Sequence, residues 1–374
     1  MRTSAVLLGG GLHKFGRYPE KSFSELTRVA ISNCLEDSTV SFSDIQAAYC
    51  GRVYAPMGTG LDVITQFGET GIPIINIEQA CSSSSTAFRQ ALWAIEQEIY
   101  DLVLVVGFEK MERGPVEIAA SNSYEMKMGH SLAPANYGLK SQIYMDRYGT
   151  TVEQFAAVSV KSHANATLNP YAQYQKTVTL QEVMESRMIS SPITLLQCSP
   201  TSDGASAVVL ASPVRAKRYS NNKKTVNVTG WACGTDSHID QDSEQLEPTV
   251  WRLSRELYER AGIVPEDIDV VQIHDAFAPA EVIRMEAMGL APEGEGARFA
   301  AEGKTGIGGS IPINTDGGLI SRGHPMGATG LAQIIEILRQ LRQEAGRRQV
   351  QGAPRVGVCH NSGVGGVNMH AFTK

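Results

Sequence analysis

The sequence predicts an α/β protein in which two similar halves build a mostly parallel sheet with helices on its faces. Short apolar runs of strand length alternate with stretches whose apolar residues recur every three or four positions. The order of these segments in residues 226–358 repeats their order in residues 5–106, which is typical of an internal duplication. A chain of 374 residues is long enough to hold two such halves.

The first half is expected to contain five strands and two helices. The predicted strands are Ala5–Leu8, Ala47–Val53, Ile72–Ile77, Asp101–Val106 and Ala205–Leu210. One predicted helix is Ser22–Leu35, with Ser22 or Ser24 as its N-cap. A second predicted helix begins at Thr86. Gly9-Gly10-Gly11 lacks the complete GxGxxG spacing, so we interpret it as a turn, and Ser202-Asp203-Gly204 as another.

A looser segment interrupts the first half, and the second half follows it. We expect an N-terminal half at 1–108 and 196–214, an inserted loop domain at 109–195 that covers the site, and a C-terminal half at 215–374. The insertion holds one clear helix, Val152–Asn165, and scattered basic residues (Lys127, Lys140, Arg147, Lys161) that we interpret as surface charges. The elements predicted for the second half are strands Val226–Trp231, Val270–Ile273 and Arg355–Val358, with helices Thr249–Arg260 and after Gly330.

Composition narrows the class of protein. A net charge of −6 and a pI near 5.8 argue against nucleic acid as the main partner. The six cysteines are scattered without CxxC pairs or zinc-like spacing, which predicts a reduced protein without a structural metal. The N-terminal apolar run is too short for a signal peptide or a membrane span. We therefore expect a cytoplasmic protein.

Cys81 is the candidate nucleophile. It lies between the strand Ile72–Ile77 and the helix that follows, and four serines come directly after it. Unpaired backbone N–H groups and the positive end of the helix dipole at such a turn stabilise a thiolate. We therefore expect the pKa of this thiol to be lowered.

Three histidines accompany this cysteine, each at a strand end or in a glycine-rich loop of the second half. They occur in His274-Asp-Ala-Phe277, in Gly323-His324-Pro-Met-Gly-Ala-Thr-Gly330 and in His360-Asn361-Ser-Gly363. Side chains in such loops gather at one edge of a sheet. A turn cysteine with several histidines favours nucleophilic catalysis with general acid and base partners.

These motifs resemble those of the thiolase superfamily, and most closely the branch of the sterol-carrier-protein thiolases. The resemblance covers nearly the whole chain. It implies the thiolase fold, with two βαβαβαββ halves in five α-β-α-β-α layers and an inserted loop domain. It also implies coenzyme A thioester chemistry, in which Cys81 is acylated and His324 activates it. Coenzyme A is then a substrate, and no tightly bound cofactor or metal is expected.

The sequence departs from its relatives at the second acid/base. Sterol-carrier-type relatives have a cysteine where this chain has Ala276, and other thiolases have one where it has His360. We assign the second acid/base to His360, with His274 as oxyanion donor or alternate acid, and the loop-supporting roles to Asn361, Gly363 and Gly323. Cys359 is expected to be a packing residue, because adjacent side chains of a strand point to opposite faces.

The resemblance leaves several functions open. The expected reaction is CoA-dependent cleavage of a 3-oxoacyl-CoA, and condensation to an acetoacetyl-CoA-type product is the same chemistry reversed. A ketoacyl synthase would lack the GHPxGATG loop, which this chain has. A retro-aldolase needs no cysteine nucleophile, and a non-catalytic lipid-binding subunit needs neither the cysteine nor the histidines, whereas this chain keeps all of them. The resemblance also implies a homodimer or dimer of dimers, and a possible small partner with a zinc ribbon and an OB-fold.

Overall fold

The computed structural model describes residues 5–114, 132–219, 225–237, 243–364 and 366–374. Its strands are β1 (Ala5–Leu12), β2 (Ala47–Gly51), β3 (Ile74–Ile77), β4 (Leu102–Lys110), β5 (Met188–Ser190), β6 (Ile193–Thr194), β7 (Asp203–Ala211), β8 (Val226–Gly234), β9 (Val270–Gln272), β10 (Val356–Gly363) and β11 (Gly366–Thr373). Its helices are α1 (Phe23–Ser38), α2 (Thr59–Thr65), α3 (Ser83–Glu96), α5 (Ala133–Tyr148), α6 (Val152–Ala166), α7 (Leu180–Glu185), α8 (Pro213–Ala216), α9 (Pro248–Ala261), α10 (Ala278–Ala287), α11 (Gly296–Ala301) and α12 (Met326–Arg342).

The strand order shows the duplication directly. The large sheet runs β3-β2-β4-β7-β1-β8-β11-β10-β9, and an isolated parallel bridge places Ile313 beside Val271 of β9. From the central β1–β8 pair outward, the strands of the first half follow the order β1, β7, β4, β2, β3, and those of the second half follow the order β8, β11, β10, β9 and then the bridge at Ile313. Counted along the chain within its own half, each series is the first, fifth, fourth, second and third strand. The expected duplication is thus present in the topology, with only a short bridge where the second half has its third strand.

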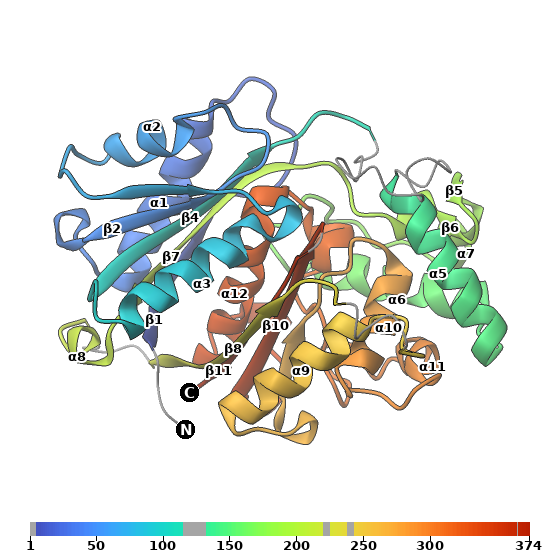
Figure 1. The fold of residues 1–374 in the computed structure, drawn as a ribbon. Helices are drawn as coiled ribbons and strands as arrows, with labels where there is room; N and C mark the ends of the chain where they lie inside the picture. Colours follow the sequence, from blue (N-terminus) through green and yellow to red (C-terminus); the bar gives the residue numbers. More distant parts are fainter. Residues whose placement is uncertain (1–4, 115–131, 220–224, 238–242, 365) are drawn as a thin grey trace.

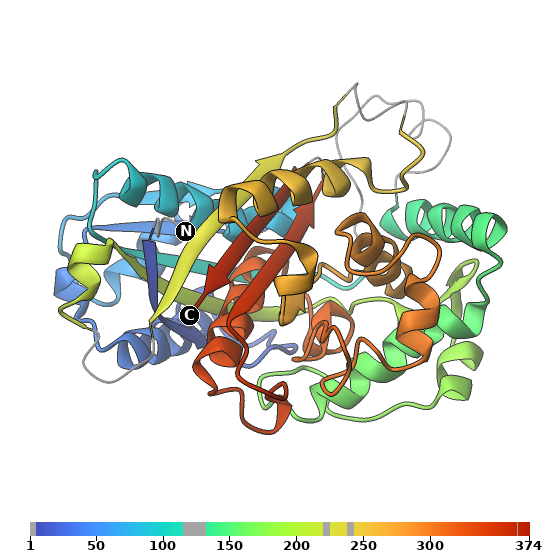
Figure 2. The ribbon, with the colours of Figure 1, turned by 90° about the horizontal axis from the view of Figure 1, so that it is seen from below.

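The layers follow from how the apolar residues cluster. The central cluster contains α3 and α12 together with strand residues of both halves, such as Val105 and Val228. A second cluster packs α9 and α10 against the sheet of the second half, and a third packs α1 and α2 against the first. Figures 1 and 2 show α3 and α12 between the two halves, with α1 and α9 on the outer faces. This is the five-layered α-β-α-β-α arrangement.

The prediction of a mostly parallel sheet is wrong. The pairs β2–β3, β2–β4 and β9–β10 are parallel, whereas β1–β7, β1–β8, β4–β7, β8–β11 and β10–β11 are antiparallel. The last strand of each half (β7 and β11) enters beside the first strand of that half (β1 and β8), and it runs against both of its neighbours. Alternation along the chain predicts the βαβ units but not the direction of this returning strand.

Two predicted turns lie inside strands. Gly9-Gly10-Gly11 belongs to β1 and Asp203-Gly204 to β7, all of them buried. A Cβ built on Gly11 would lie 2.2 Å from the carbonyl oxygen of Ala30, so α1 packs directly on the strand backbone. Glycine here serves a close approach of helix and strand rather than a turn. The predicted cap of α1 is confirmed, since Ser22 accepts from the backbone of Glu25 and the two form a capping box.

The inserted segment contains α5, α6 and α7, at the right of Figure 1, and α6 packs against α10 and α11 of the second half. Among its basic residues, Lys127 lies outside the described residues. Lys161 is not a surface charge: it forms an ion pair with Glu281, whose side chain is fully buried. In the described ranges, no helix combines the length and the apolar character that crossing a bilayer requires.

Candidate active site

Cys81 occupies a 3₁₀ turn, Ala80–Ser82, between β3 and α3, and its side chain is half-buried. The preceding residue, Ala80, has φ 46, in the left-handed region that a residue with a Cβ seldom adopts. Backbone of this kind persists where the surroundings enforce it, and it occurs often at functional sites. The turn presents the thiol ahead of the first turn of α3.

The serines that follow Cys81 hold this turn in place. The Ser82 hydroxyl donates to Gln79 O at 2.8 Å and the Ser83 hydroxyl to Ala80 O at 2.7 Å. Ser83 Oγ also accepts from the Gln79 backbone N–H at 2.8 Å. Serines readily form such local bonds to the backbone. The serine run signalled the turn in the sequence, but these partners could not be predicted from it.

His324 lies in the loop that precedes α12. Its backbone N–H donates to Ser202 Oγ at 2.9 Å, and Gly323 before it has φ 108. The ring Nδ1 lies 2.7 Å from Thr329 Oγ1, whose hydroxyl donates to Pro325 O at 3.0 Å. The Thr329 hydroxyl oxygen is then the acceptor, and Nδ1 of His324 carries the proton. Its Nε2 is left with a free lone pair, as a general base requires.

His274 has the opposite tautomer. Its Nδ1 accepts from Asn361 Nδ2 at 3.0 Å, so its proton lies on Nε2. Asn361 also donates to Gln333 Oε1 at 2.9 Å and accepts from the Ser85 hydroxyl at 2.7 Å, and these two bonds fix the orientation of its amide. His274 is therefore a hydrogen-bond donor at Nε2, suited to an oxyanion or to a general acid.

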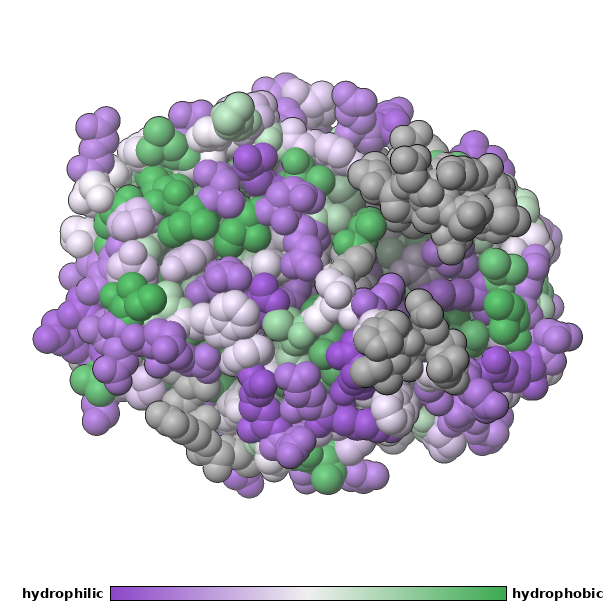
Figure 3. Space-filling view, viewed as in Figure 1, coloured by the Kyte–Doolittle hydropathy of each residue, from purple (hydrophilic) through white to green (hydrophobic). Residues whose placement is uncertain are grey.

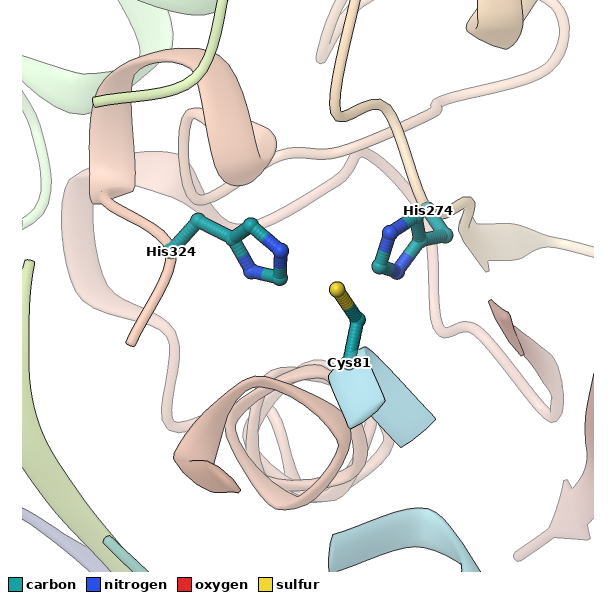
Figure 4. A group of neighbouring side chains, drawn as sticks. All are labelled: Cys81, His274 and His324. Carbon is teal, nitrogen blue, oxygen red and sulfur yellow. The ribbon is translucent and has the colours of Figure 1, made fainter. Parts of the chain in front are cut away.

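The structure brings Cys81, His274 and His324 together. One ligand-type atom from each, Sγ of the cysteine and a ring nitrogen of each histidine, lies within 4.8 Å of the others. The two imidazole rings stand edge to face, with centroids 5.2 Å apart and planes at 87°. Figure 4 shows the thiol between the two rings. A thiol, a base and a donor thus meet at one point, which is the arrangement that nucleophilic acyl transfer needs.

The same three atoms are also ligands that a Zn²⁺ ion accepts. A zinc ion requires its ligand atoms within about 2.0–2.3 Å of a single point. The three atoms lie within 4.8 Å of one another, so their spacing does not exclude such an ion, but the Nε2 of His274 carries a proton that a zinc ligand would have to lose. The protonation of the two rings therefore suits a thiol flanked by a base and a donor.

Burial governs the ionisation of this site. It raises the pKa of the Cys81 thiol to about 12, and the nearby charge of Glu109 adds to this, against the lowering effects of a backbone hydrogen bond and of Arg284. It lowers the pKa of His324 to about 3, with the charge on Arg322 contributing, and takes the pKa of His274 well below 6.5. The prediction that the pKa of the Cys81 thiol is lowered is therefore wrong. A neutral thiol faces a neutral imidazole.

His360 does not point at the thiol. It is paired in β10 with Met369 of β11, and directly paired residues lie on the same face of a sheet. Met369 packs in the outer cluster with α9 and α10, so the ring of His360 faces these helices. Its Nδ1 accepts from the backbone N–H of His274, at 3.4 Å. Cys359 and Asn361 lie on the opposite face, toward α12, with Cys359 packed in the central core.

The two predicted supporting glycines lie at close backbone contacts. A Cβ on Gly363 would lie 2.5 Å from Gln79 O, in the turn that carries Cys81, and one on Gly323 would lie 2.9 Å from Ser202 Oγ. Both glycines thus let a neighbouring segment approach the site. Sequence reasoning missed Ser202 and Thr329, which hold His324, and Arg284, whose Nη1 donates to the backbone oxygen of His274. No motif singled out these residues.

Fold and site together define an α/β protein of two duplicated halves with a cysteine from one half and two histidines from the other. The chain belongs to the thiolase family. The family model described as "Thiolase, N-terminal domain" matches residues 6–213, and the one described as "Thiolase C-terminal domain-like" matches residues 233–374.

Several curated relatives are similar over nearly the whole chain. Sterol carrier protein 2 from Bos taurus is 38% identical over 98% of this chain and 71% of its own length. Acetyl-CoA acetyltransferase from Methanothermobacter thermautotrophicus is 38% identical over the full length of both. Among solved structures, the Ltp2-ChsH2(DUF35) aldolase matches with a TM-score of 0.85, 23% identity and coverage of 99% and 97%. That likeness shows the shared fold alone.

Proposed function

We propose that this protein is a thiolase that cleaves a 3-oxoacyl-CoA with coenzyme A through an acyl-Cys81 intermediate. The observation that carries the proposal is that the Cys81 thiol and a ring nitrogen of each of His324 and His274 lie within 4.8 Å of one another, with a free lone pair on His324 Nε2 and an N–H on His274 Nε2. The family membership and the similarity to an acetyl-CoA acetyltransferase support the same chemistry.

In the first half of the proposed reaction, His324 Nε2 takes the thiol proton as Cys81 Sγ attacks the 3-keto carbon. A thiol whose pKa is raised to about 12 needs this transfer, and a histidine whose pKa is lowered to about 3 holds no proton at neutral pH. The tetrahedral oxyanion then collapses, the Cα–Cβ bond breaks, and the electron pair leaves as the enolate of the shorter acyl-CoA. The His274 N–H donates to the developing oxyanion and then protonates the α-carbon, and His324 passes the proton it took from the thiol to His274, so both imidazoles are neutral again.

In the second half, coenzyme A enters as a thiol. His324 Nε2 accepts its proton, the new thiolate attacks the acyl-Cys81 carbonyl, and the proton returns to Cys81 as the second thioester leaves. Because every step is reversible, the same groups would condense two acyl-CoA molecules. The names of relatives include both an acetyl-CoA acetyltransferase and a benzoylsuccinyl-CoA thiolase subunit, from Thauera aromatica. These names therefore leave the acyl chain and the direction open.

The role of second acid/base goes to His274 in this proposal, in place of His360. His274 shares the pocket with the thiol, whereas His360 faces α9 and α10. The decisive comparison is between His274→Ala and His360→Ala in solvent deuterium incorporation at the α-carbon of the released acyl-CoA. We expect the His274 variant to lose this exchange. Loss in the His360 variant alone would return the role to His360.

The proposed reaction is tested by incubating the protein with acetoacetyl-CoA and coenzyme A. Acetyl-CoA should form, and peptide mass spectrometry of the protein quenched in acid should show an acetyl group on the Cys81 peptide. A retro-aldolase would instead cleave a 3-hydroxyacyl-CoA without an acyl-enzyme and without coenzyme A. A non-catalytic lipid-binding subunit would do neither, so the three readings give three different results.

The proposal needs no metal, and this too is open to test. Chelator-treated protein should keep its full rate. Added Zn²⁺ should inhibit, because Cys81, His274 and His324 supply ligands that zinc prefers. Loss of activity on chelation, restored by zinc, would contradict the mechanism.

We also propose that the chain works as a dimer in the reducing cytoplasm. All six cysteines are free, which suits a reducing compartment. β3 is an edge strand of the large sheet, and such an edge presents unpaired backbone groups. Figure 3 shows hydrophobic residues gathering over the face that carries α2 and β2, where Leu61 is 54% exposed. Light scattering of the purified protein checks this state.

A small partner with a zinc ribbon and an OB-fold is part of the same proposal. The Ltp2-ChsH2(DUF35) aldolase, whose fold is similar, is named for two components, Ltp2 and ChsH2(DUF35). Co-expression with the product of a neighbouring gene, followed by size-exclusion chromatography, is the test. Separate elution and an unchanged rate would remove the partner from the proposal.

A further inference from the structure

A second polar cluster lies beside the site, and the proposed mechanism does not use it. It consists of Arg284 on α10, Lys140 and Tyr137 on α5, Glu247 at the start of α9, and His360 on β10. We call these five residues the cationic cluster. They come from the inserted segment and from the second half, on the face of β10 opposite to α12.

Arg284 is the centre of the cationic cluster, and it is only 3% exposed. Its Nη1 donates to the backbone oxygen of His274, and its Nη2 donates to the Tyr137 hydroxyl at 2.7 Å. Within the described ranges, Glu247 is the one carboxylate within 4 Å of its guanidinium, at 3.9 Å, and the buried carboxyl of Asp275 acts on it from farther away. That carboxylate already accepts from Lys140 Nζ at 2.9 Å. The buried guanidinium thus lacks a close anionic partner of its own.

The charges of the cluster do not balance. Arg284 and Lys140 are cations and Glu247 is an anion: burial would raise the pKa of Glu247, but the two cations outweigh it and hold that pKa at about 2. Burial lowers the pKa of His360 to about 3, so its ring is neutral. Burial raises the pKa of the neighbouring Asp275 carboxyl well above its usual range, which favours its neutral form, so it does not supply the missing negative charge. The excess positive charge therefore rests on the buried Arg284, where an unpaired ion is costly, while the Lys140 side chain is 33% exposed.

Two buried N–H groups of the cluster also lack acceptors. In the part of the chain that the structure describes, neither Arg284 Nε nor His360 Nε2 has a hydrogen-bond partner. His360 Nδ1 accepts from the His274 backbone, so the ring proton is on Nε2, the atom without a partner. Buried donors are nearly always satisfied, so each unsatisfied one needs an explanation. A carboxylate has the charge and the two acceptor oxygens that this cluster lacks.

The cluster lies next to the reacting atoms. Arg284 contacts the backbone of His274, whose ring shares the site with the Cys81 thiol, and its charge acts on the pKa of that thiol. A group held by the cluster would therefore be part of the acyl chain. The phosphates of coenzyme A are excluded, because the long pantetheine arm keeps them far from the thioester.

We infer that the acyl group carried by Cys81 ends in a carboxylate, and that Arg284, with Lys140 and His360 beside it, binds that carboxylate. The substrate class is then a 3-oxoacyl-CoA with a free acid at the far end of its acyl chain. The inference rests on the proposed function for the identity of the reacting acyl group, but the binding of the carboxylate can be measured without turnover.

The probes are succinyl-CoA and butyryl-CoA, which have acyl chains of equal length that end in a carboxylate or in a methyl group. Neither has a 3-oxo group, and a Cys81→Ala background prevents acylation, so calorimetry reads binding alone. Succinyl-CoA should bind at least about tenfold more tightly, the usual effect of a hydrogen bond to a charged group. Equal affinities would overturn the inference.

Single variants in the same background assign the effect to residues. Arg284→Met should weaken succinyl-CoA about 10- to 100-fold and butyryl-CoA less than about threefold. Lys140→Met should have a smaller effect of the same kind, and Glu247→Gln the opposite one, because it removes a competing anion. Arg298→Met, at a 51% exposed side chain on α11, is the matched control and should change neither ligand.

Equal weakening of both ligands by Arg284→Met would mean that this arginine only supports the His274 loop or meets coenzyme A. If Arg284→Met does not fold, Lys140→Met and Glu247→Gln still test the inference, since their effects on succinyl-CoA binding should have opposite signs.

Turnover separates this inference from the proposed function. A protein that cleaves acetoacetyl-CoA but binds the two probes equally keeps the function and loses the inference. One that prefers succinyl-CoA but cleaves no 3-oxoacyl-CoA keeps the inference and loses the function.

Discussion

The start of α3 and the start of α12 occupy equivalent places in the two halves, and they differ in what they hold. Before α3, a turn strained at Ala80 presents the Cys81 thiol. Before α12, a loop opened by Gly323 presents the His324 imidazole. The helices pack against each other so closely that a Cβ on Gly330 would lie 2.7 Å from the backbone nitrogen of Ser85. Duplication thus supplies two adjacent helix starts, and the residues placed there divide the chemistry between nucleophile and base.

The largest expected effect comes from removing the nucleophile. Cys81→Ala should lower kcat by at least about 10³-fold, since losing the residue that forms a covalent intermediate removes the reaction path. Thiolysis of acetoacetyl-CoA, followed by absorbance, measures it. Cys359→Ala, in the central core, is the control and should cost about 1 kcal/mol of stability without changing kcat. Undiminished turnover in Cys81→Ala would show that the first helix start holds no nucleophile.

The base on the second helix start should matter almost as much. His324→Ala should reduce kcat about 10²–10⁴-fold, the range expected for a general base. It should also slow alkylation of Cys81 by iodoacetamide at neutral pH, because the thiol no longer has an acceptor for its proton. In His274→Ala, alkylation should stay fast while C–C cleavage falls. If both variants alkylate at the wild-type rate, the thiol ionises without either histidine.

Thr329 should have a smaller, purely positional effect. Thr329→Val keeps the shape but removes the oxygen that accepts from His324 Nδ1, so the imidazole no longer prefers the tautomer with a free Nε2. We expect about a tenfold loss of kcat with little change in KM. Thr329→Ser, which keeps the oxygen, should restore the rate. A serine variant as slow as the valine variant would point to packing instead.

The smallest effect concerns acid stability. Burial lowers the pKa values of His324, His360 and His370 to about 3, below the unfolded value of 6.5. The unfolded state therefore binds more protons below pH 6.5, and stability that is complete above this pH falls as the pH drops. Each group contributes at most about 1.4 kcal/mol per pH unit. Buried carboxyl groups with raised pKa values, such as Glu109 at about 7, have the opposite pH dependence. The contribution of His370 is therefore measured as a difference: the free energy of unfolding of His370→Gln, outside the site, should fall less between pH 7 and pH 5 than that of the wild type. An equally steep decline in that variant would exclude His370 as a contributor.

Much of the site was predictable because its residues lie in motifs, and the family could be inferred from the GHPxGATG loop. What the sequence could not give was orientation. Whether His360 or its neighbours face the thiol depends on the register of β10 with β11, which follows from the fold rather than from local pattern. The raised pKa of Cys81 was missed for a related reason: a turn at a helix start predicts dipole stabilisation, whereas burial depends on everything that packs over it. Arg284 was missed because a helical pattern does not show which of its residues contacts a distant loop.

The glycines between the helices and strands have a mechanical consequence. A Cβ on Gly327 would lie 2.3 Å from Phe108 O, and one on Gly51 would lie 2.5 Å from the Cα of Ser84. With backbone against backbone, neither helix start has room to slide, so the distance between thiol and imidazole is set before any substrate arrives. Adaptation to different acyl groups should then be confined to α5 and α10, whose side chains Tyr137 and Arg284 meet beside the site. Structures of the free and acylated protein would show it as shifts in Tyr137 and Arg284 around an unmoved Cys81 and His324.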